Sequence, residues 1–442
     1  MNKSEPQRWK ASFFTIWTGQ QLSYVGSRAA QFALVFWLTK TTGSATILAT
    51  ATMVALFPNI LLGPFAGALV DRWNRRTVMM VSDSFIAVVS LWLAYVFWAG
   101  AMQPWHIYVA MLARALGETF HGPAMLASTS LMVPERHYTR VSGLNQTING
   151  LLNIVGPPLG ALLMALMPLH RVMLFDVVTA AFAVTPLLFI AVPQPAKEHT
   201  EALKASSFLT NTWEGLRFVL SWPGMLALVL MASIMKITLM PAFSLAPILV
   251  LKHFGGGAPE LSLFDAIAGV GILIGGLVMG VWGGFRKKIH TTLLGVIGIG
   301  AASILLGLTP ASMFWLALVS VFFLGAMIAL TDAPIMAIMQ AAVPVEKQGR
   351  VFGLLGSLFS ISTPIGLAMA GPISDVIGVS FWFVIGGCVF VVGGIASFFV
   401  RPMMQIEDQK LNGVSVDDDV LRKASAQVAT ASPATSHGTT TD

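Results

Sequence analysis

Long apolar stretches dominate this chain and leave few folds open to it. Of its 442 residues, 55% are hydrophobic and only 10% are charged, whereas an ordinary soluble protein has about 25% charged residues. A helix of about 20 apolar residues crosses the hydrocarbon core of a bilayer. Twelve stretches have that character, at residues 12–38, 45–70, 77–99, 105–132, 139–165, 170–192, 215–250, 261–284, 289–308, 312–341, 350–371 and 379–400. The sequence therefore predicts an all-α integral membrane protein with twelve transmembrane helices. The seventh stretch contains Pro241 and Pro247, so we expect that helix to be broken.

Basic residues gather in alternate loops between these stretches. With the N-terminus inside, the cytoplasmic side holds Arg72, Arg75, Arg76, Arg136, Arg140, Lys197, Lys204, Arg286, Lys287, Lys288, Lys347 and Arg350. The opposite side holds only Lys40, Arg171 and Lys252. This asymmetry predicts a multi-pass protein of the cell membrane with both termini in the cytoplasm. Because the net charge of +6 is spread over short loops, nucleic acid is not expected as a partner.

The two parts of the chain repeat each other. Val133-Pro134 with Arg140-Val141-x-Gly143 recurs 210 residues later as Val343-Pro344 with Arg350-Val351-x-Gly353. Such repeats are typical of transporters with a binding site between two halves. We predict an N-terminal six-helix half (1–192), a cytoplasmic linker (193–212), a C-terminal six-helix half (213–402) and a disordered cytoplasmic tail (403–442).

One loop between two apolar stretches carries an unusual concentration of charge. It reads Gly67-Ala-Leu-Val-Asp71-Arg72-Trp-Asn-Arg75-Arg76. This order resembles the loop motif of the major facilitator superfamily, at the place between helices two and three where that family has it. The second half has a degenerate version of the motif, Gly280-x-x-x-Gly284-Phe-Arg286-Lys287-Lys288, which lacks the acidic residue.

Further segments narrow the resemblance to one branch. Gly156-Pro157-Pro158-Leu-Gly160 resembles the antiporter motif of that superfamily's exporters, although Ala161 replaces its second glycine. The run from Phe36 to Ala45 and the segment Phe120-His121-Gly-Pro-Ala resemble the macrolide-efflux branch of drug:proton antiporters. The resemblance implies a bacterial secondary active transporter that exports hydrophobic or amphipathic, macrolide-like drugs by proton antiport with alternating access.

The loop motif is predicted to act as a gate. Asp71 can accept hydrogen bonds from Arg72 or from a neighbouring helix N-terminus, which would clamp the two halves together on the cytoplasmic side. Gly67 would allow a close helix approach. Arg75 and Arg76 would also face anionic headgroups, with Asp83 as their counter-ion. In the alternative, the arginines only fix the topology.

Charged residues within the predicted spans are candidates for function, because a charge inside the bilayer is costly. Glu118 is the predicted proton carrier: it would hold a proton when the cavity is dry and release it on pairing with Arg114, four residues away. Asp332 is the second candidate, for the proton or for a cationic drug. In the alternative, Arg114 and Glu118 form a static ion pair. For Asp176, which lies next to Arg171, we expect helix-end capping or a salt bridge.

A larger set of residues is predicted to line a substrate cavity. His121 and Asp332 are counterparts in the repeat, so both should approach the cavity from opposite halves. Lys236 and Asp265 are expected to pair with each other or to contact substrate. The predicted cavity residues are Arg28, Tyr24, His121, Met125, Asn145, Asn149, Asn153, Lys236, Asp265 and Met336.

Two other classes of function remain as alternatives at this stage. Arg28 and Lys236 would suit an anionic headgroup, so the chain could instead export or flip an amphipathic metabolite such as a siderophore or lysolipid. A membrane enzyme is disfavoured, because the sequence has no metal-ligand cluster, nucleophile elbow or phosphate-binding loop. The expected partners are thus a small-molecule substrate, protons and the lipid bilayer, with no cofactor or metal, and a monomer suffices. The single cysteine, Cys388, excludes a disulfide.

Overall fold

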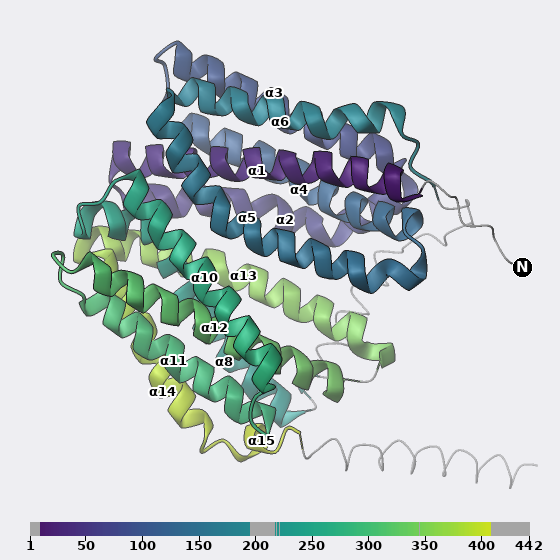
Figure 1. The fold of residues 1–442 in the computed structure, drawn as a ribbon. Helices are drawn as coiled ribbons and strands as arrows, with labels where there is room; N and C mark the ends of the chain where they lie inside the picture. The colour runs from purple at the N-terminus through teal and green to yellow at the C-terminus, as the bar shows by residue number, and fades with distance from the viewer. Residues whose placement is uncertain (1–8, 195–216, 218, 221, 344, 408–442) are drawn as a thin grey trace, which may run out of the picture.

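The chain folds into a set of long helices (Figure 1). The structure, a computed structural model, describes residues 9–194, 217, 219–220, 222–343 and 345–407. Its long helices are α1 (Trp9–Thr42), α2 (Ala45–Arg72), α3 (Arg75–Trp98), α4 (Pro104–Met132), α5 (Tyr138–Leu166), α6 (Leu169–Phe189), α8 (Pro223–Ser244), α10 (Ala258–Trp282), α11 (Lys288–Leu308), α12 (Phe314–Ala342), α13 (Val345–Ile377) and α14 (Val379–Ser397). The short ones are η1 (Glu135–His137), α9 (Ala246–Ile248), η2 (Leu249–His253) and α15 (Arg401–Met404).

The long helices agree with the predicted spans. Within the described residues, 10 helices are long and apolar enough to cross a membrane. The two others, α1 and α4, have 34 and 29 residues. Both are long enough to cross, but polar residues such as Gln20, Arg28, Arg114 and Glu118 interrupt their apolar character. The predicted fold class, an all-α membrane protein with twelve transmembrane helices, is confirmed.

The seventh span is broken, as predicted. Helix α8 ends at Ser244, and the chain continues through the short α9 and a π-helical turn, η2. Pro241 and Pro247 lie on either side of this end. Proline has no N–H group to donate within a helix and its ring clashes with the preceding turn, so both residues favour the interruption.

The long helices pack in two groups. In the first, α1 lies against α5 and α6, α2 against α4, and α3 against α4 and α6. In the second, α12 lies against α10 and α11, and α14 against α11 and α8, which also contacts α13. The first group is the upper one in Figure 1, and the second is the lower one. The main contacts between the groups join α2 to α13 and α5 to α10.

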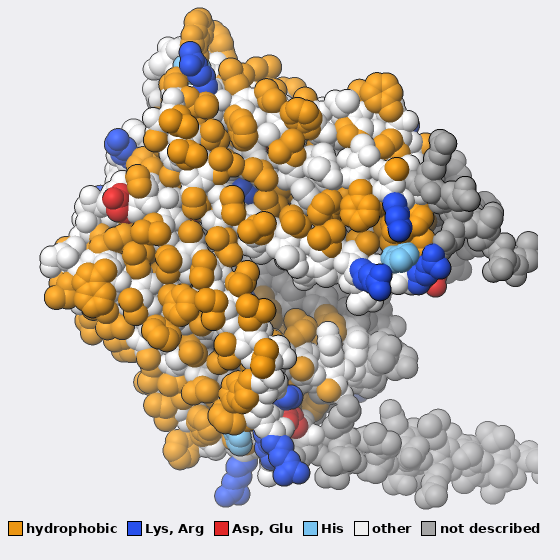
Figure 2. All heavy atoms as spheres, viewed as in Figure 1, with side chains coloured by type: hydrophobic (Ala, Val, Ile, Leu, Met, Phe, Trp, Pro, Cys, Tyr) orange, Lys and Arg blue, Asp and Glu red, His pale blue; other side chains and the backbone are white. Residues whose placement is uncertain are grey.

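The two groups meet at one end of the molecule and separate at the other. At the meeting end, a Cβ atom on Gly371 of α13 would lie 3.0 Å from Ala49 Cβ of α2. Further along the same two helices, Cβ atoms on Gly67 and Gly353 would have no atom within 4 Å. We call the end with residues 43–46 and 371–378 the closed end, and the end with residues 67–76 and 345–356 the open end. Figure 2 shows the surface hollowed between the groups toward the open end.

The outer surface is suited to lipid. Hydrophobic side chains cover the visible sides of the helices in Figure 2, and most of the visible Lys and Arg side chains lie near the helix ends. Large exposed residues such as Val81, Val281 and Phe399 belong to this surface. Cys388 is also exposed, on α14. Since so much apolar surface is unfavourable in contact with water, a bilayer is the environment in which it is stable.

The C-terminal boundary of the folded part is later than predicted. The predicted tail starts at residue 403, but Met403 and Ile406 are buried against Leu228, Ile289 and Leu293. The Ile289 amide also donates to the Glu407 carboxylate at 2.8 Å. These apolar contacts keep residues 403–407 with the C-terminal helices. Most of the predicted linker (195–212) and the rest of the predicted tail (408–442) lie outside the described residues.

Candidate transport site

A buried ion pair joins α4 to α6 in the first group. Arg114 Nη1 lies 2.6 Å from Asp176 Oδ2, and both side chains are buried. Ser90 Oγ donates to the same carboxylate oxygen at 2.7 Å, and Ser27 Oγ donates to the other at 2.9 Å. The prediction that Arg114 pairs with Glu118 is therefore wrong, and the salt bridge expected for Asp176 is formed with Arg114 rather than with the neighbouring Arg171. The Arg114 side chain points from α4 toward α6, where it meets Asp176, whereas Glu118 is exposed.

A second buried polar cluster lies between α1, α3 and α4. His121 Nε2 faces Asp83 Oδ1 at 3.4 Å, and Gln20 Nε2 donates to Asp83 Oδ2 at 2.8 Å. Tyr24 Oη lies 3.2 Å from His121 Nδ1. Asp83 is thus not the counter-ion of Arg75 or Arg76, because its two oxygens are turned toward α1 and α4.

Two predicted cavity residues lie in packed regions instead. His121 is only 3% exposed, so it does not approach the cavity as the repeat argument predicted, whereas its counterpart Asp332 is exposed. Met125 is half-buried against the apolar clusters that contain Ile16 and Phe13. Helix α4 packs against α1, α2 and α3, and the repeat alone does not determine the direction of a side chain.

The predicted proton-coupling and cavity residues of the first group that are exposed lie on α1, α4 and α5. Glu118 and Arg28 are both exposed and close enough to Tyr24 to act on it electrostatically. On α5, Asn149 and Asn153 are exposed, while Asn145 is half-buried and accepts a hydrogen bond from Trp17 Nε1 at 2.6 Å. Among the predicted proton-coupling and cavity residues, the first group thus exposes one carboxylate, one guanidinium and two amides.

The second group offers a smaller polar set. Asp332 and Met336 are exposed on α12. Lys236 of α8 acts electrostatically on Asp332 and lies 5.3 Å from the centre of the Phe359 ring. Asp265 of α10 is half-buried and forms no ion pair within the described ranges. The predicted Lys236–Asp265 pair is therefore wrong, because Lys236 is directed to α12 and α13.

The predicted antiporter motif packs α5 against α1. A Cβ atom on Gly156 would lie 2.8 Å from Arg28 Cβ, and one on Gly160 would lie 2.9 Å from the Ala29 carbonyl. Pro157 and Pro158 stand between them, half-buried inside α5. The small residues allow the two helices to approach closely, which holds Arg28 beside the middle of α5.

The loop motif is bonded within its own group of helices. Arg75 Nη2 lies 3.2 Å from Asp71 Oδ1, and its Nη1 donates to the Ala127 carbonyl at 3.0 Å. Arg76 donates to the Leu187 and Leu188 carbonyls of α6. Arg72 is exposed. Because Arg75 is buried and both guanidiniums bond to backbone, they do not face headgroups as predicted.

The predicted close helix approach at Gly67 is not present at the open end, because a Cβ atom on Gly67 would have no atom within 4 Å.

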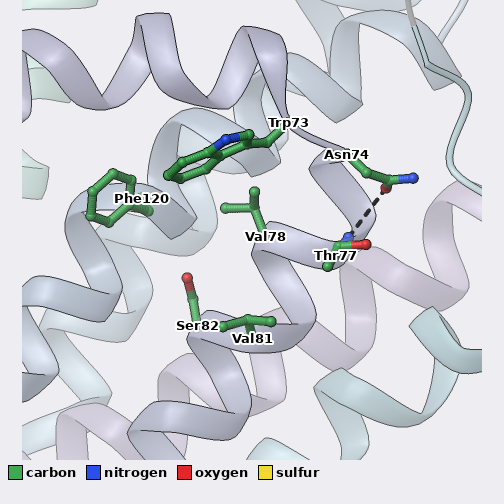
Figure 3. A pocket seen from close by; sticks show the side chains of 7 residues that line it. All are labelled: Trp73, Asn74, Thr77, Val78, Val81, Ser82 and Phe120. Atoms are coloured by element: carbon green, nitrogen blue, oxygen red, sulfur yellow. Dashed lines mark hydrogen bonds between the residues drawn. The ribbon is translucent and has the colours of Figure 1, made fainter.

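The Asn74 side chain caps α3 by accepting a hydrogen bond from the Thr77 amide at 3.3 Å. Beside it lies a cavity of about 380 Å³, lined by Trp73, Asn74, Thr77, Val78, Val81, Ser82 and Phe120 (Figure 3).

A contact between the groups at the closed end was not predicted. Asp375 of α13 accepts hydrogen bonds from Ser44 Oγ at 2.8 Å, from the Ala45 amide at 2.6 Å and from the Thr46 amide at 3.0 Å. It thereby caps α2 from the other group. Asp375 lies in the last turn of α13, where the helix dipole disfavours an acidic side chain. An acidic residue in that position could have indicated from the sequence that it has a partner in another helix.

Comparison with known proteins identifies the family. The chain matches the transmembrane secretion effector family over residues 5–424, and it belongs to this family of major facilitator transporters. It is 30% identical over 399 residues to macrolide efflux protein A of Streptococcus pyogenes, which covers 90% of this chain and 98% of the relative. It is 28% identical to the multidrug efflux pump Tap of Mycolicibacterium fortuitum, over 83% of this chain and 90% of that pump.

Solved structures agree on the fold. A mutant of the nucleoside transporter NupG matches with a TM-score of 0.68 at 12% identity, covering 87% of this chain and 98% of that one. A bacterial homologue of the human lysosomal transporter Spinster, in an inward-facing and unoccupied conformation, matches with a TM-score of 0.63 at 14% identity, over 92% and 99%. The predicted superfamily is confirmed. The chain is a multi-pass efflux transporter for small molecules and not an enzyme.

Proposed function

We propose that this transporter exports hydrophobic or amphipathic, macrolide-like drugs in exchange for protons. The main support is a pair of exposed carboxylates, Glu118 on α4 and Asp332 on α12, in the spanning helices of two groups that separate toward the open end. Because a charge within the bilayer region is costly, a charged residue in a spanning helix is a candidate for function. The relatives named for macrolide and multidrug efflux support this substrate class.

The helix contacts support transport by alternating access. The groups touch at the closed end and separate at the open end, so a substrate could enter from one side only. The basic loops near the open end support assigning this end to the cytoplasmic side, with both termini in the cytoplasm of a bacterial cell. Opening at the other side would require α2 to leave α13 while the loop motif closes the open end. A single chain contains both halves, so a monomer suffices.

The two carboxylates have different neighbours, which suggests different roles. Glu118 lies beside Tyr24 and is one helical turn from His121, so it is suited to pass protons between the cavity and the interior. Asp332 lies near Lys236, beside the exposed Met336. It is suited to hold the amine of a macrolide, with methionine contacting the apolar ring.

An amphipathic metabolite with an anionic headgroup is the second candidate substrate. The exposed Arg28 and the half-buried Lys236 favour it, because cations inside a membrane protein can bind such a group. Siderophores and lysolipids have this chemistry.

The test is accumulation of a labelled macrolide in bacteria stripped of their own efflux pumps. We expect the chain to lower accumulation, a protonophore to restore it, and Glu118→Gln to abolish the effect. Glu135→Gln is the matched control, since it makes the same substitution at an exposed carboxylate on η1, which is not among the predicted site residues. Accumulation equal to the empty vector would reject the macrolide substrate. Export that continues unchanged in the presence of the protonophore would reject proton antiport.

A further inference from the structure

Two carboxylates are buried in the first helix group, and only one of them is paired with a permanent charge. Asp176 pairs with Arg114, whose guanidinium does not lose its proton in proteins. Asp83, 6% exposed, faces His121, which is 3% exposed. Histidine can be neutral or cationic near neutral pH. The net charge of the Arg114–Asp176 pair is therefore fixed at zero, whereas that of Asp83 and His121 can change by one proton.

From these contacts we infer that Asp83 and His121 form the buried proton-storage pair of the transport cycle, connected to the cavity through Tyr24. This inference deepens the proposed proton antiport and depends on it. With a neutral imidazole, the pair has a net negative charge in a region of low dielectric. With one more proton, it becomes an imidazolium beside a carboxylate, and the net charge is zero. Since a buried unpaired charge is costly, the pair is suited to take up one proton when the site is dry.

The surrounding groups allow this change without rearrangement. Gln20 keeps its bond to the far oxygen of Asp83 in either state. His121 Nε2 has no hydrogen-bond partner in the described parts of the chain, and the near oxygen of Asp83 lies 3.4 Å from it. The charged or titratable groups that act on the pair are Glu118 and Tyr24, with Arg28 acting on Tyr24. Helix α2, which packs against α4, has charges only at its end, Asp71 and Arg72.

A proton path follows from the order of contacts. Tyr24 Oη lies 3.2 Å from His121 Nδ1 and is also close to the exposed Glu118. Tyr24 can give its hydroxyl proton to Nδ1 while it accepts another from Glu118 or from cavity water. His121 then has protons on both ring nitrogens, one facing Tyr24 and one facing Asp83. When the drug enters the cavity, release follows the reverse order: Nδ1 returns a proton to Tyr24, which passes its own hydroxyl proton to Glu118 or to cavity water.

The experiment counts protons released when a macrolide binds. Purified full-length protein in weakly buffered detergent solution is mixed with erythromycin, and a pH indicator follows release while fluorescence follows binding. We expect about one proton per bound drug for the unchanged protein, and less than a fifth of that for His121→Gln and Asp83→Asn. Tyr24→Phe should release the same number at least tenfold more slowly. His106→Gln, the same substitution in the first turn of α4, should behave like the unchanged protein.

The outcomes separate the inference from the proposed function. If the unchanged protein binds the drug without releasing protons, proton antiport itself is rejected. If it releases protons and both His121→Gln and Asp83→Asn still do so fully, the storage pair is wrong and the released proton comes from another group, such as Glu118 or Asp332. Asp83→Asn keeps the shape of the side chain and can retain the Gln20 bond, so it gives the answer even if His121→Gln fails to fold.

Discussion

The carboxylate of Asp375 accepts a hydrogen bond from the hydroxyl of Ser44 at 2.8 Å, from one helix group to the other. The same carboxylate accepts from two amides at the start of α2. Because a helix N-terminus has unpaired N–H groups and a partial positive charge, an acidic side chain there is stabilising. The contact exists only while α2 lies against α13, so it favours the conformation with the closed end shut.

Replacing Asp375 by alanine should open the closed end more often. The contact is exposed, so we expect a loss of about 0.5–1 kcal/mol, a two- to fivefold change in the ratio of the two conformations. Spin labels on Ala101→Cys and Ala311→Cys, in a Cys388→Ala background, would measure the distance between the loops at that end. Ser374→Ala is the control, because its hydroxyl has no hydrogen-bond partner within the described residues. An unchanged distance distribution for Asp375→Ala would show that the contact does not hold the end closed.

Two glycines on the paired helices α2 and α13 should behave differently. A Cβ atom on Gly371 would lie 3.0 Å from Thr46 Cα, so Gly371→Val should push α2 away and lengthen the Ala101–Ala311 distance. Gly67 has open space around it. Gly67→Val should leave that distance short, and should hinder the closure of the open end that the loop motif is proposed to make. Lengthening by both variants would contradict this account of the two ends.

The Arg114–Asp176 pair should be structural. Removal of one partner of a buried ion pair costs about 3–5 kcal/mol, because the other charge is left unpaired. We therefore expect Arg114→Leu or Asp176→Leu alone to lower the thermal unfolding temperature of the detergent-solubilised protein sharply. The double variant should recover much of the loss. A double variant as unstable as the sum of the two singles would mean that the residues act independently.

Asp332 should contribute to binding of the cationic drug rather than to proton transfer. If it contacts the macrolide amine, Asp332→Asn should weaken erythromycin binding about tenfold, which corresponds to roughly 1.4 kcal/mol. An analogue without the amino group should bind equally well to both proteins. Equal weakening for the two drugs would instead assign Asp332 to the shape of the cavity, and a loss of proton release would assign it to coupling.

The sequence predicted the parts of this protein that depend on local patterns. The apolar runs predicted the spans, Pro241 and Pro247 predicted the break in the seventh span, and the loop motif indicated the superfamily. The sequence did not predict which of several partners, distant in the chain, a buried side chain contacts. Glu118, four residues from Arg114, is a plausible partner by helix periodicity, yet Asp176 on α6 is the one in contact. Asp83 was assigned to nearby arginines, but α4 turns His121 toward it. Such choices depend on how the helices pack, which periodicity does not specify.

The central claim, proton-driven export, is tested most directly with purified protein in liposomes. Vesicles with an acidic interior are diluted into neutral buffer containing labelled erythromycin. Protein-free vesicles serve as the baseline, because a weak base accumulates in an acidic interior without a transporter. We predict uptake well above this baseline, loss of the excess when a protonophore removes the gradient, and loss of it in the Glu118→Gln protein. Uptake no greater than in protein-free vesicles, by a protein that still binds the drug, would contradict proton antiport.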